Sequence, residues 1–243
     1  MTQAAVLAGG LGTRLRPLTE GVPKVLAPVM GRPFVEYQLE LLKKNGVGDF
    51  VFCVGHQGEK VERHLGDGRG FGCRIVYSYD GPRLLGPAGA LKRAEALLRD
   101  RFFVTYGDAY LRAPYATLME ALSTSGKLAV MAVYRNDDRF GKSDVIVQEG
   151  AVAKYDKKSR AEGMNWINYG VTALRREALA LIPEGRFCDE ETFYGSLIER
   201  KQLLAFQVTE RFYEIGTPAS LSEFEAFIGG QAKASQGLQP GQP

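Results

Sequence analysis

The strongest constraint on the fold of this 243-residue chain is a glycine-rich segment that directly follows an apolar run near its start. Residues 4–8 are all apolar, which predicts a buried strand. Three glycines occur within residues 9–12, and glycines let the backbone reach positive φ and let a ligand approach the main chain closely. Successive backbone N–H groups in such a turn form an anion-binding concavity. Because Arg14 and Lys24 add positive charges nearby, the segment predicts a triphosphate-binding loop.

Two common phosphate loops do not match this segment. The Walker pattern G-x-x-x-x-G-K-[ST] is absent, because no Gly-Lys-Ser/Thr sequence follows the loop. The dinucleotide fingerprint G-x-G-x-x-G also fails, since counting from Gly10 places Leu15 at the third glycine position. A glycine-rich loop alone is compatible with an ordinary tight turn, so the residues around it have to decide between the two interpretations.

The complete string from Leu7 to Pro17, followed by Pro23 and Lys24, is far more specific than its glycines. It resembles the opening motif of the sugar-1-phosphate nucleotidylyltransferase family, L-A-G-G-x-G-T-R-L-x-P-L-T followed by P-K. The resemblance runs from residue 4 to residue 227, nearly the whole chain. Within that family, the short length and residues 28–37 are most similar to the guanylyltransferases that activate heptose 1-phosphate.

Composition and charge argue against several other classes of protein. The formal net charge is +3 with acids and bases well mixed, whereas a nucleic-acid- or membrane-binding protein would carry a basic stripe. Cys53, Cys73 and Cys188 form no C-x-x-C pair, which predicts buried thiols in a reducing compartment. With no long apolar run and no signal-peptide pattern, we expect a soluble, cytoplasmic protein without a nucleic-acid or membrane partner. The oligomeric state stays open, with a homo-oligomer as one option.

Strand and helix patterns alternate along the chain. We expect strands over residues 4–8, 50–54, 74–78, 102–106, 128–134, 145–147 and 152–155, and helices over 33–46 and 87–98. This alternation predicts βαβ units and an α/β fold, a Rossmann-like three-layer sandwich with a mainly parallel mixed sheet. The family resemblance implies the glycosyltransferase-A-like nucleotidyltransferase form of that fold.

A single domain accounts for most of the chain. We expect one nucleotidyltransferase domain over residues 1–230, with a nucleotide-binding part over 1–135 and a sugar-binding part over 136–230. Residues 231–243 consist mostly of Gln, Gly, Ser, Ala and Pro and lack an apolar anchor, which predicts a disordered tail. No internal repeat is visible, including the hexapeptide repeat of longer members of the family.

The resemblance implies nucleotidyl transfer, in which an oxygen of a sugar 1-phosphate attacks the α-phosphorus of a nucleoside triphosphate and pyrophosphate leaves. Both reactants are negatively charged, so the protein has to neutralise charge and align them. Arg14, Lys24 and Asp108 are the expected catalytic residues. Arg14 would hold two oxygens of the leaving pyrophosphate, and Lys24 would act as a point charge on the α-phosphate or the sugar phosphate. Arg16 would brace the loop.

The resemblance also implies a magnesium cofactor, with Asp108 and Glu214 as metal ligands. Asp108 follows the apolar residues 102–106 through Gly107, which predicts a carboxylate at the carboxyl end of a central strand. Glu214 stands where the family motif D-I-G-T-P has aspartate, and its side chain is one methylene longer. Mg²⁺ suits such a site because it takes one or two carboxylates together with substrate oxygens and water.

Two glycine segments would form the nucleotide site. The second, residues 85–91, resembles the family's G-T-A-G-A-L, where the backbone faces the base and the helix N-terminus adds partial positive charge. Pro87 replaces the usual threonine, which removes an N–H and a hydroxyl. The expected nucleotide-binding residues are Leu7, Ala8, Gly9, Gly10, Gly12, Thr13, Arg14, Gly86, Pro87, Ala88 and Gly89.

The sugar phosphate is expected to contact the later part of the chain. Asp156 and Lys157 match the family's E-E-K-P segment, in which the lysine contacts the sugar phosphate and the acid accepts sugar hydroxyls. Asn168 and Gly170 match its N-A-G-I segment beside the sugar. The expected sugar-phosphate-binding residues are Gly107, Asp156, Lys157, Asn168 and Gly170.

Several alternatives remain beside the favoured pair of GTP with a heptose or hexose 1-phosphate. UTP, dTTP or CTP with another sugar phosphate fits the same motifs, and a transferase for a non-sugar phosphate fits all but the sugar segments. A catalytically inactive, nucleotide-sugar-sensing regulatory subunit would have lost a core residue. This chain keeps Arg14, Lys24 and Asp108, and only Glu214 favours that alternative.

Overall fold

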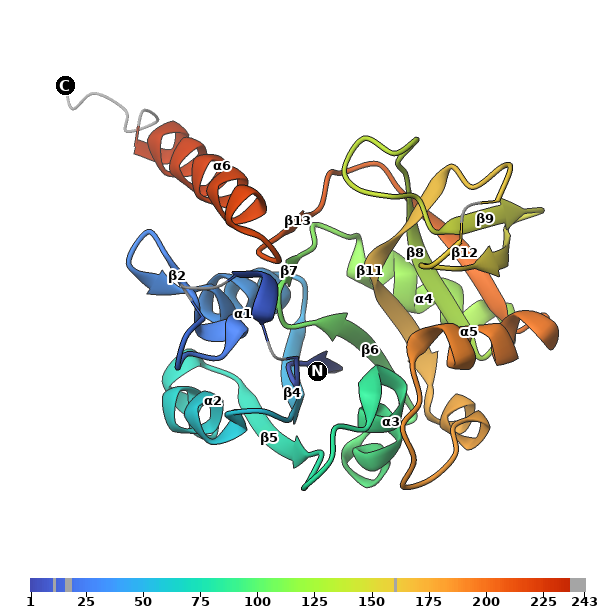
Figure 1. Ribbon diagram of the computed structural model, residues 1–243, viewed down its shortest axis with the longest axis horizontal. Helices are drawn as coiled ribbons and strands as arrows, with labels where there is room; N and C mark the ends of the chain where they lie inside the picture. The colour runs from blue at the N-terminus through green and yellow to red at the C-terminus, as the bar shows by residue number, and fades with distance from the viewer. Residues whose placement is uncertain (11, 16–18, 160, 237–243) are drawn as a thin grey trace.

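A mixed β-sheet passes through the whole molecule, with helices on both faces (Figure 1). The computed structural model describes residues 1–10, 12–15, 19–159 and 161–236. The sheet strands are β1 (Thr2–Leu7), β4 (Val47–Val54), β5 (Arg74–Tyr79), β6 (Arg101–Tyr106), β8 (Ala129–Arg135), β9 (Val145–Gln148), β10 (Ala151–Tyr155), β11 (Trp166–Arg175) and β12 (Leu203–Val208). The α-helices are α1 (Phe34–Lys44), α2 (Gly58–Leu65), α3 (Gly86–Arg93), α4 (Tyr115–Ser125), α5 (Glu190–Glu199) and α6 (Pro218–Gln236). Two short ribbons pair β2 (Pro28–Val29) with β3 (Arg32–Pro33) and β7 (Ala109–Tyr110) with β13 (Tyr213–Glu214).

In the described part of the chain the sheet has nine strands, in the order β5-β4-β1-β6-β11-β8-β12-β10-β9. Strands β5, β4, β1 and β6 are parallel to one another, whereas β11 runs antiparallel to both β6 and β8. Strand β12 is parallel to β8 and antiparallel to β10. The expected α/β class and mixed sheet are confirmed, although parallel pairing prevails only in the β5-to-β6 half. The sheet continues without a break beyond residue 135.

Alternate side chains of the central strands enter two separate apolar cores. Phe50 and Phe52 of β4 pack in the core formed with α1, α2 and α4, whereas Val51 packs in the core formed with α3 and α5. All residues of β4 are buried, as expected for a parallel strand covered on both faces. These two cores on either side of one sheet confirm the predicted three-layer sandwich.

A third apolar cluster lies beneath α6. The Phe224 ring of this helix is buried and packs 5.1 Å from the ring of Phe34 in α1 and 5.0 Å from that of Tyr110 in β7. Since α6 continues to Gln236, the start of the expected disordered tail is helical, and residues 237–243 lie outside the described part of the chain. No helix among the described residues combines the length and apolarity needed to cross a membrane.

Candidate active site

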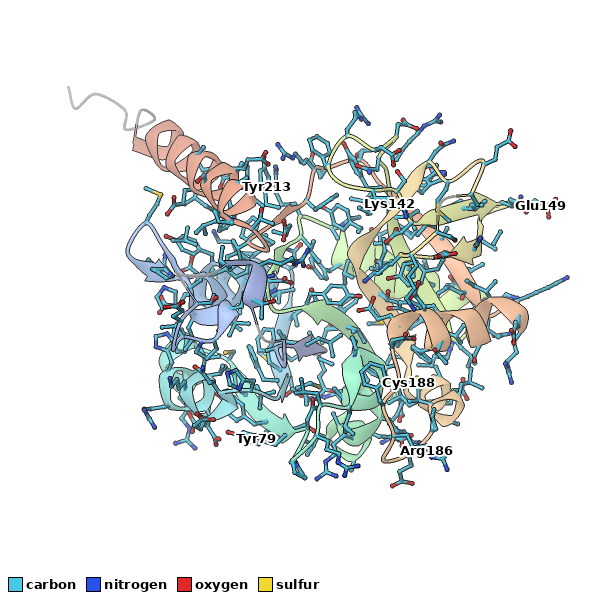
Figure 2. All side chains as sticks on the ribbon, in the orientation of Figure 1. Tyr79, Lys142, Glu149, Arg186, Cys188 and Tyr213 are labelled. Atoms are coloured by element: carbon cyan, nitrogen blue, oxygen red, sulfur yellow. The ribbon has the colours of Figure 1, made fainter. Side chains whose placement is uncertain are left out.

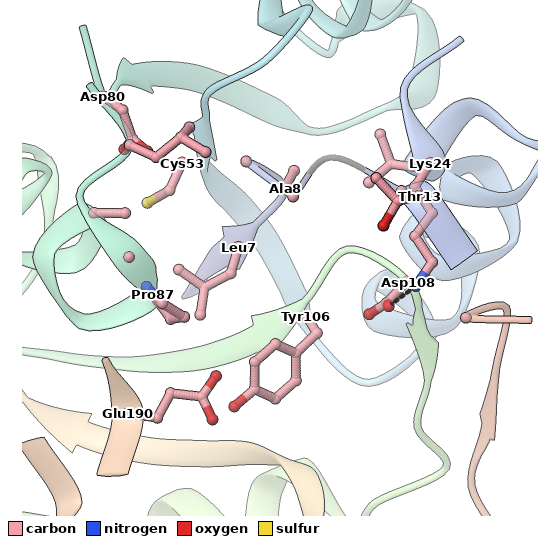
Figure 3. A pocket seen from close by; sticks show the side chains of 18 of the residues that line it. Leu7, Ala8, Thr13, Lys24, Cys53, Asp80, Pro87, Tyr106, Asp108 and Glu190 are labelled. Atoms are coloured by element: carbon pink, nitrogen blue, oxygen red, sulfur yellow. Dashed lines mark hydrogen bonds and ion pairs between the residues drawn. The ribbon is translucent and has the colours of Figure 1, made fainter. Parts of the chain in front are cut away.

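A cavity of about 630 Å³ opens at the carboxyl ends of β1, β4 and β6 (Figure 3). Open parallel sheets bind their ligands at this edge. The described residues that line the cavity are Leu7, Ala8, Gly9, Gly10, Gly12, Thr13, Arg14, Lys24, Val25, Cys53, Asp80, Leu84, Gly86, Pro87, Ala90, Tyr106, Asp108, Lys157, Phe187, Glu190 and Gly216. The cavity therefore brings the first glycine segment together with Arg14, Lys24, Asp108 and Lys157, which come from distant parts of the sequence.

The first glycine segment continues from the edge of the sheet into the cavity wall. The Ala8 N–H donates to the Cys53 carbonyl at 2.8 Å and so extends the pairing of β1 with β4. Gly12 has a φ of 62°, a conformation that glycine adopts without strain. Arg14 is exposed in the cavity wall and makes no hydrogen bond or ion pair with a described residue, so its guanidinium is available to an anion. Arg16, the expected brace of this loop, lies outside the described residues.

Lys24 and Asp108 form an ion pair in the cavity (dashed line in Figure 3). Their side chains are 13% and 29% exposed, so the pair is sheltered yet reachable from the cavity. Lys24 begins a short 3-10 turn, Lys24–Leu26, and Asp108 follows the end of β6. Charges that are partly buried are screened less by salt than surface charges are. A phosphate group in the cavity could therefore contact Lys24 directly. The same phosphate could contact a metal ion held by Asp108.

Close packing of two strand ends sets the position of Asp108. The Gly107 N–H donates to the Leu7 carbonyl at 2.9 Å. A Cβ added at Gly107 would lie 2.5 Å from Val25 Cγ1, so no larger residue fits without a shift. Gly107 does not line the cavity. Its small size lets Asp108 lie close to β1, and the sugar-binding role expected for Gly107 stays a prediction.

A buried glutamine holds the same turn from the other side. Gln38 of α1 is 2% exposed, and its side-chain amide donates to the carbonyls of Tyr106 and Ala109, each at 2.7 Å. These two carbonyls flank Asp108 in the chain. Because buried carbonyls without partners are costly, the amide stabilises the turn in one conformation. Helix α1 therefore positions the carboxylate that the sequence singles out.

Glu214, the second expected metal ligand, lies beside Asp108 along the backbone. It is opposite Ala109 in the β7–β13 ribbon, and the Ile215 N–H donates to the Asp108 carbonyl at 3.0 Å. The Glu214 carboxylate, however, accepts a hydrogen bond from the Gly216 N–H. Gly216 lines the cavity, and Glu214 does not. The backbone places Glu214 next to Asp108, whereas its carboxylate is hydrogen-bonded within its own turn.

The residues at this end of the cavity fit a magnesium ion through Asp108. No group of three or more His, Cys, Asp or Glu side chains in the described ranges could hold a metal by itself. Mg²⁺ does not require one, because it retains several waters and is commonly held by one or two carboxylates plus phosphate oxygens. Asp108 opens into the cavity, and Glu214 would join it only after leaving the Gly216 N–H.

The second glycine segment begins α3, but part of its backbone is already engaged. Ala88 and Gly89 donate their N–H groups to the Cys188 carbonyl at 3.1 and 3.2 Å, on the segment labelled in Figure 2. Gly86 and Pro87 line the cavity, whereas Ala88 and Gly89 do not. The contact of all four residues with a nucleotide stays a prediction. The Ala88 and Gly89 N–H groups at the helix start are already satisfied by a protein carbonyl.

Lys157 lines the cavity, as the resemblance implied. Its Nζ lies 2.8 Å from Glu190 Oε2 and 5.6 Å from the centre of the Tyr106 ring. Figure 3 shows the Tyr106 hydroxyl and the Glu190 carboxylate pointing toward one another. Burial raises the pKa of Tyr106, and the nearby Glu190 charge acts in the same direction. The tyrosine hydroxyl therefore stays protonated and can donate a hydrogen bond.

The Asp156 carboxylate is engaged within its own turn. It accepts hydrogen bonds from the backbone N–H groups of Lys158 and Ser159, at 2.9 and 2.8 Å, and from the Ser159 hydroxyl. These bonds, led by the one from the hydroxyl, lower the pKa of the carboxyl. Asp156 does not line the cavity. It caps its own turn, and its expected contact with sugar hydroxyls stays a prediction.

Asn168 and Gly170 lie in β11 and are also absent from the cavity wall. The Asn168 side-chain oxygen accepts from the Gly170 N–H at 3.0 Å, and the Asn168 N–H donates to Asp144 Oδ1 at 2.8 Å. Gly170 has a φ of 101°, and the pairing of β11 with β8 shifts register in this stretch. Burial raises the pKa of Asp144 to about 6. Both residues thus shape an irregular part of the strand and do not meet the cavity directly.

Two buried acids in the cavity wall were missed from the sequence. Asp80, directly after β5, is 8% exposed, and its carboxylate accepts one hydrogen bond among the described residues, from the Leu85 N–H at 3.3 Å. Burial raises the pKa of its carboxyl. Glu190, at the start of α5, is likewise 8% exposed. For Asp80 the signal was available, since it follows an apolar strand as Asp108 does. Other missed lining residues are Val25, Cys53, Leu84, Ala90, Tyr106, Phe187 and Gly216.

A family model described as nucleotidyl transferase matches residues 3–230. The chain belongs to this family. The match confirms the family that the resemblance of the glycine-rich motif indicated. The nucleotidyl transferase relatives include proteins named guanylyltransferases and uridylyltransferases, and a solved structure of similar fold is named an inositol-1-phosphate CTP transferase, so membership leaves the base open.

Among the relatives, a mannose-1-phosphate guanyltransferase of Saccharomyces cerevisiae is 32% identical over 88% of this chain and 61% of its own length. A D-glycero-alpha-D-manno-heptose 1-phosphate guanylyltransferase of Campylobacter jejuni is 28% identical over 91% of this chain and 98% of its own length. The crystal structure of HddC from Yersinia pseudotuberculosis complexed with GMP-PN has a TM-score of 0.77 at 23% identity, covering 94% of this chain and 100% of that one, and shows the shared fold. The chain spans only 52% to 61% of the length of several curated relatives.

Proposed function

We propose that this protein is a sugar-1-phosphate nucleotidylyltransferase, which converts a nucleoside triphosphate and a sugar 1-phosphate into a nucleoside diphosphate sugar and pyrophosphate. The observation that carries the proposal is the Lys24–Asp108 pair, set between the first glycine segment and Lys157 in one cavity. A phosphate-binding loop on one side and a separate cation on the other suit two phosphorylated substrates that meet in the middle.

The chain's own residues support an in-line displacement. An oxygen of the sugar phosphate forms a bond to the α-phosphorus as the bond to the pyrophosphate oxygen breaks, and the electron pair leaves with pyrophosphate. No protein nucleophile is needed, because the incoming phosphate is itself nucleophilic. Arg14 is proposed to hold the departing pyrophosphate and Lys24 the α-phosphate. Lys157 is proposed to bind the sugar phosphate and align its oxygen.

Magnesium is the proposed cofactor, held by Asp108 with Glu214 as a second ligand. When bound there it would neutralise phosphate charge and orient the triphosphate. In this structure Asp108 is paired with the Lys24 ammonium, so a metal ion bound by Asp108 would share the carboxylate with the lysine or displace it.

Variants of Glu214 test its place in the metal site. We expect Glu214→Asp to retain most activity, and Glu214→Ala to raise the Mg²⁺ concentration for half-maximal pyrophosphate release by about 10- to 100-fold. The measurement is a magnesium titration at saturating substrates, together with thermal unfolding. A lowered unfolding temperature with normal Mg²⁺ dependence in Glu214→Ala would leave only its hydrogen bond to the Gly216 N–H as its role.

GTP is the proposed nucleotide, and Asp80 supports it. The acid lines the cavity near Cys53 and the second glycine segment, away from the Lys24–Asp108 pair (Figure 3). A carboxylate only accepts hydrogen bonds. Guanine presents two neighbouring donors, N1–H and N2–H₂, on one edge, whereas the corresponding edge of uracil or thymine places carbonyl oxygens beside a single N–H. A buried acid at the base end of the cavity therefore favours guanine, with a heptose or hexose 1-phosphate as the second substrate.

Asp80→Asn is expected to weaken the choice of base. The asparagine can still accept from the Leu85 N–H, but it offers a donor where guanine needs an acceptor. The ratio of kcat/KM for GTP over UTP should fall by about 10- to 100-fold, in line with the usual value of a two-donor contact. Asp67→Asn, an exposed acid outside the cavity wall, is the control. An unchanged ratio in Asp80→Asn means that another group selects the base.

The experiment that tests the function is pyrophosphate release with Mg²⁺, screening five nucleoside triphosphates against a panel of sugar 1-phosphates that includes heptose 1-phosphate. Release that requires both substrates is the expected result, and the best pair identifies base and sugar. Tight binding of a nucleoside diphosphate sugar without release from any pair would contradict the proposal and support a regulatory subunit.

A further inference from the structure

Glu190 is a buried acid in the cavity wall that neither the motif nor the reaction explains. Its carboxylate accepts from the Tyr155 hydroxyl and from Lys157 Nζ, each at 2.8 Å and each at the same oxygen, Oε2. Asp189 caps the start of α5 by accepting from the Thr192 N–H at 2.9 Å, so Glu190 is not needed as the cap. The structure thus keeps a carboxylate at the cavity surface although helix α5 does not require it there.

The acid expected to serve the sugar is engaged elsewhere. Asp156 binds two backbone N–H groups and a hydroxyl of its own turn, and its side chain is outside the cavity wall. An ionised carboxylate offers about four acceptor sites, and three of those of Asp156 are used within its own turn. An acid that lines the cavity next to Lys157 is therefore a better placed acceptor for sugar hydroxyls.

Three acids line the cavity among the described residues, and their positions assign them to different parts of it. Asp108 is paired with Lys24, and Asp80 lies beside Cys53 at the opposite end from that pair (Figure 3). Glu190 alone is in contact with Lys157. The Tyr106 hydroxyl also hydrogen-bonds the Glu190 carboxylate. Figure 3 shows the two groups pointing toward one another in the cavity.

We propose that Glu190 recognises the sugar: its carboxylate accepts hydrogen bonds from hydroxyl groups of the sugar ring and holds Lys157 against the sugar phosphate. The inference rests on the proposed function and assigns one determinant of its second substrate. Glu190 and Lys157 together would bind a polyhydroxylated ring that bears a phosphate. At least one hydroxyl of that ring would be directed away from the phosphate and would donate to Glu190.

The charges at this point are suited to that ligand. Lys157 supplies a positive charge for the phosphate, and the Glu190 carboxylate supplies an acceptor for hydroxyls at 2.8 Å from the lysine nitrogen. A hydrogen bond from a neutral hydroxyl to a charged acceptor is among the stronger ones in proteins. Free phosphate would gain from Lys157 but would be repelled by Glu190. The pair therefore favours a sugar phosphate over inorganic phosphate.

The first test compares Glu190→Gln with its neighbour Glu191→Gln. Glu191 accepts from the Lys157 N–H at 2.9 Å but does not line the cavity, which makes it a matched control for a charge lost at the start of α5. We expect Glu190→Gln to raise the KM for the sugar 1-phosphate about 10- to 100-fold, with the KM for the triphosphate changed less than about twofold. Glu191→Gln should leave both close to the wild-type values. A thermal unfolding curve verifies that each variant is folded.

The second test distinguishes sugar recognition from a purely structural role. Sugar 1-phosphates that each lack one hydroxyl are compared in wild type and in Glu190→Gln. For the hydroxyl that contacts Glu190, the wild type should lose about tenfold in kcat/KM on its removal, and the variant should lose almost nothing, because the two changes delete the same contact. Lys157→Met should weaken all sugar phosphates equally, whichever hydroxyl is missing.

The outcomes distinguish a failure of the proposed function from a failure of the role assigned to Glu190. If wild type releases no pyrophosphate with any pair, the proposed function is wrong and the assignment of Glu190 falls with it. If wild type is active but Glu190→Gln behaves as Glu191→Gln does, or loses the same factor with every deoxy sugar, the function stands and the role of Glu190 is overturned. A sugar-specific defect in Asp156→Asn that is absent from Glu190→Gln would return the role to Asp156.

Discussion

The Asp108→Asn variant is expected to fold normally and to lose at least about a hundredfold in kcat. Asparagine has the same size, and the backbone contact of residue 108 with the Ile215 N–H is independent of its side chain. The negative charge beside Lys24 disappears, and with it the carboxylate proposed to hold magnesium. The measurement is single-turnover pyrophosphate release at saturating Mg²⁺, combined with thermal unfolding to confirm the fold.

An acid far from the cavity supplies the control for this loss. Asp100 has a side chain that is 87% exposed and pairs with Arg176 at 2.7 Å, so Asp100→Asn should retain the wild-type rate. An Asp108→Asn variant with more than about a tenth of the wild-type rate would be too active for a residue that holds the metal.

Lys24→Met is expected to lower kcat/KM by roughly 10²- to 10³-fold, the usual effect of removing one group that stabilises charge in a transition state. Methionine retains much of the apolar stem, so packing in the cavity wall changes little. Removal of the ammonium also frees the Asp108 carboxylate from its partner. The rate should therefore fall while the Mg²⁺ concentration for half-maximal activity stays equal or decreases, which a magnesium titration of the variant measures.

The Lys24 prediction has two checks. Lys44→Met alters an exposed lysine at the end of α1 and should be neutral. In the double variant with Asp108→Asn, the loss in log kcat/KM should be smaller than the sum of the two single-variant losses, because the two side chains are in contact. Fully additive losses would show that the pair does not act as a unit.

Much of the fold could be predicted because its signals are local. The apolar runs at residues 4–8, 50–54 and 102–106 are long enough to mark buried strands. The last two lie within β4 and β6, and the first extends one residue beyond the end of β1. Helices α2, α4, α5 and α6 were not predicted. Helix α2 is only eight residues long and follows Gln57 in the left-handed region, so neither its length nor its start resembles the usual signals.

Some residues of the candidate site could likewise be predicted from local motifs, and others could not. Lys24 and Asp108 could be found because each belongs to a short string with a specific spacing, and the sheet brings the two strings together. The roles of Asp156 and Glu190 could not be read from the sequence. Whether Asp156 faces a ligand or its own turn depends on Ser159 three residues later, and Glu190 reaches the cavity only through the packing of α5 against the sheet.

The Cys188 carbonyl connects the start of α3 with the segment that leads into α5. It accepts from the Ala88 and Gly89 N–H groups at the start of α3, while the Glu190 carboxylate, two residues further along, accepts from Lys157 Nζ. The Cys188 N–H adds a third hydrogen bond between the two segments by donating to the Leu85 carbonyl at 2.8 Å. Three hydrogen bonds therefore hold the start of α3 against the segment that leads into α5. A ligand that displaced the start of α3 would have to break these bonds or shift the segment that carries Glu190, which would couple the two ends of the cavity.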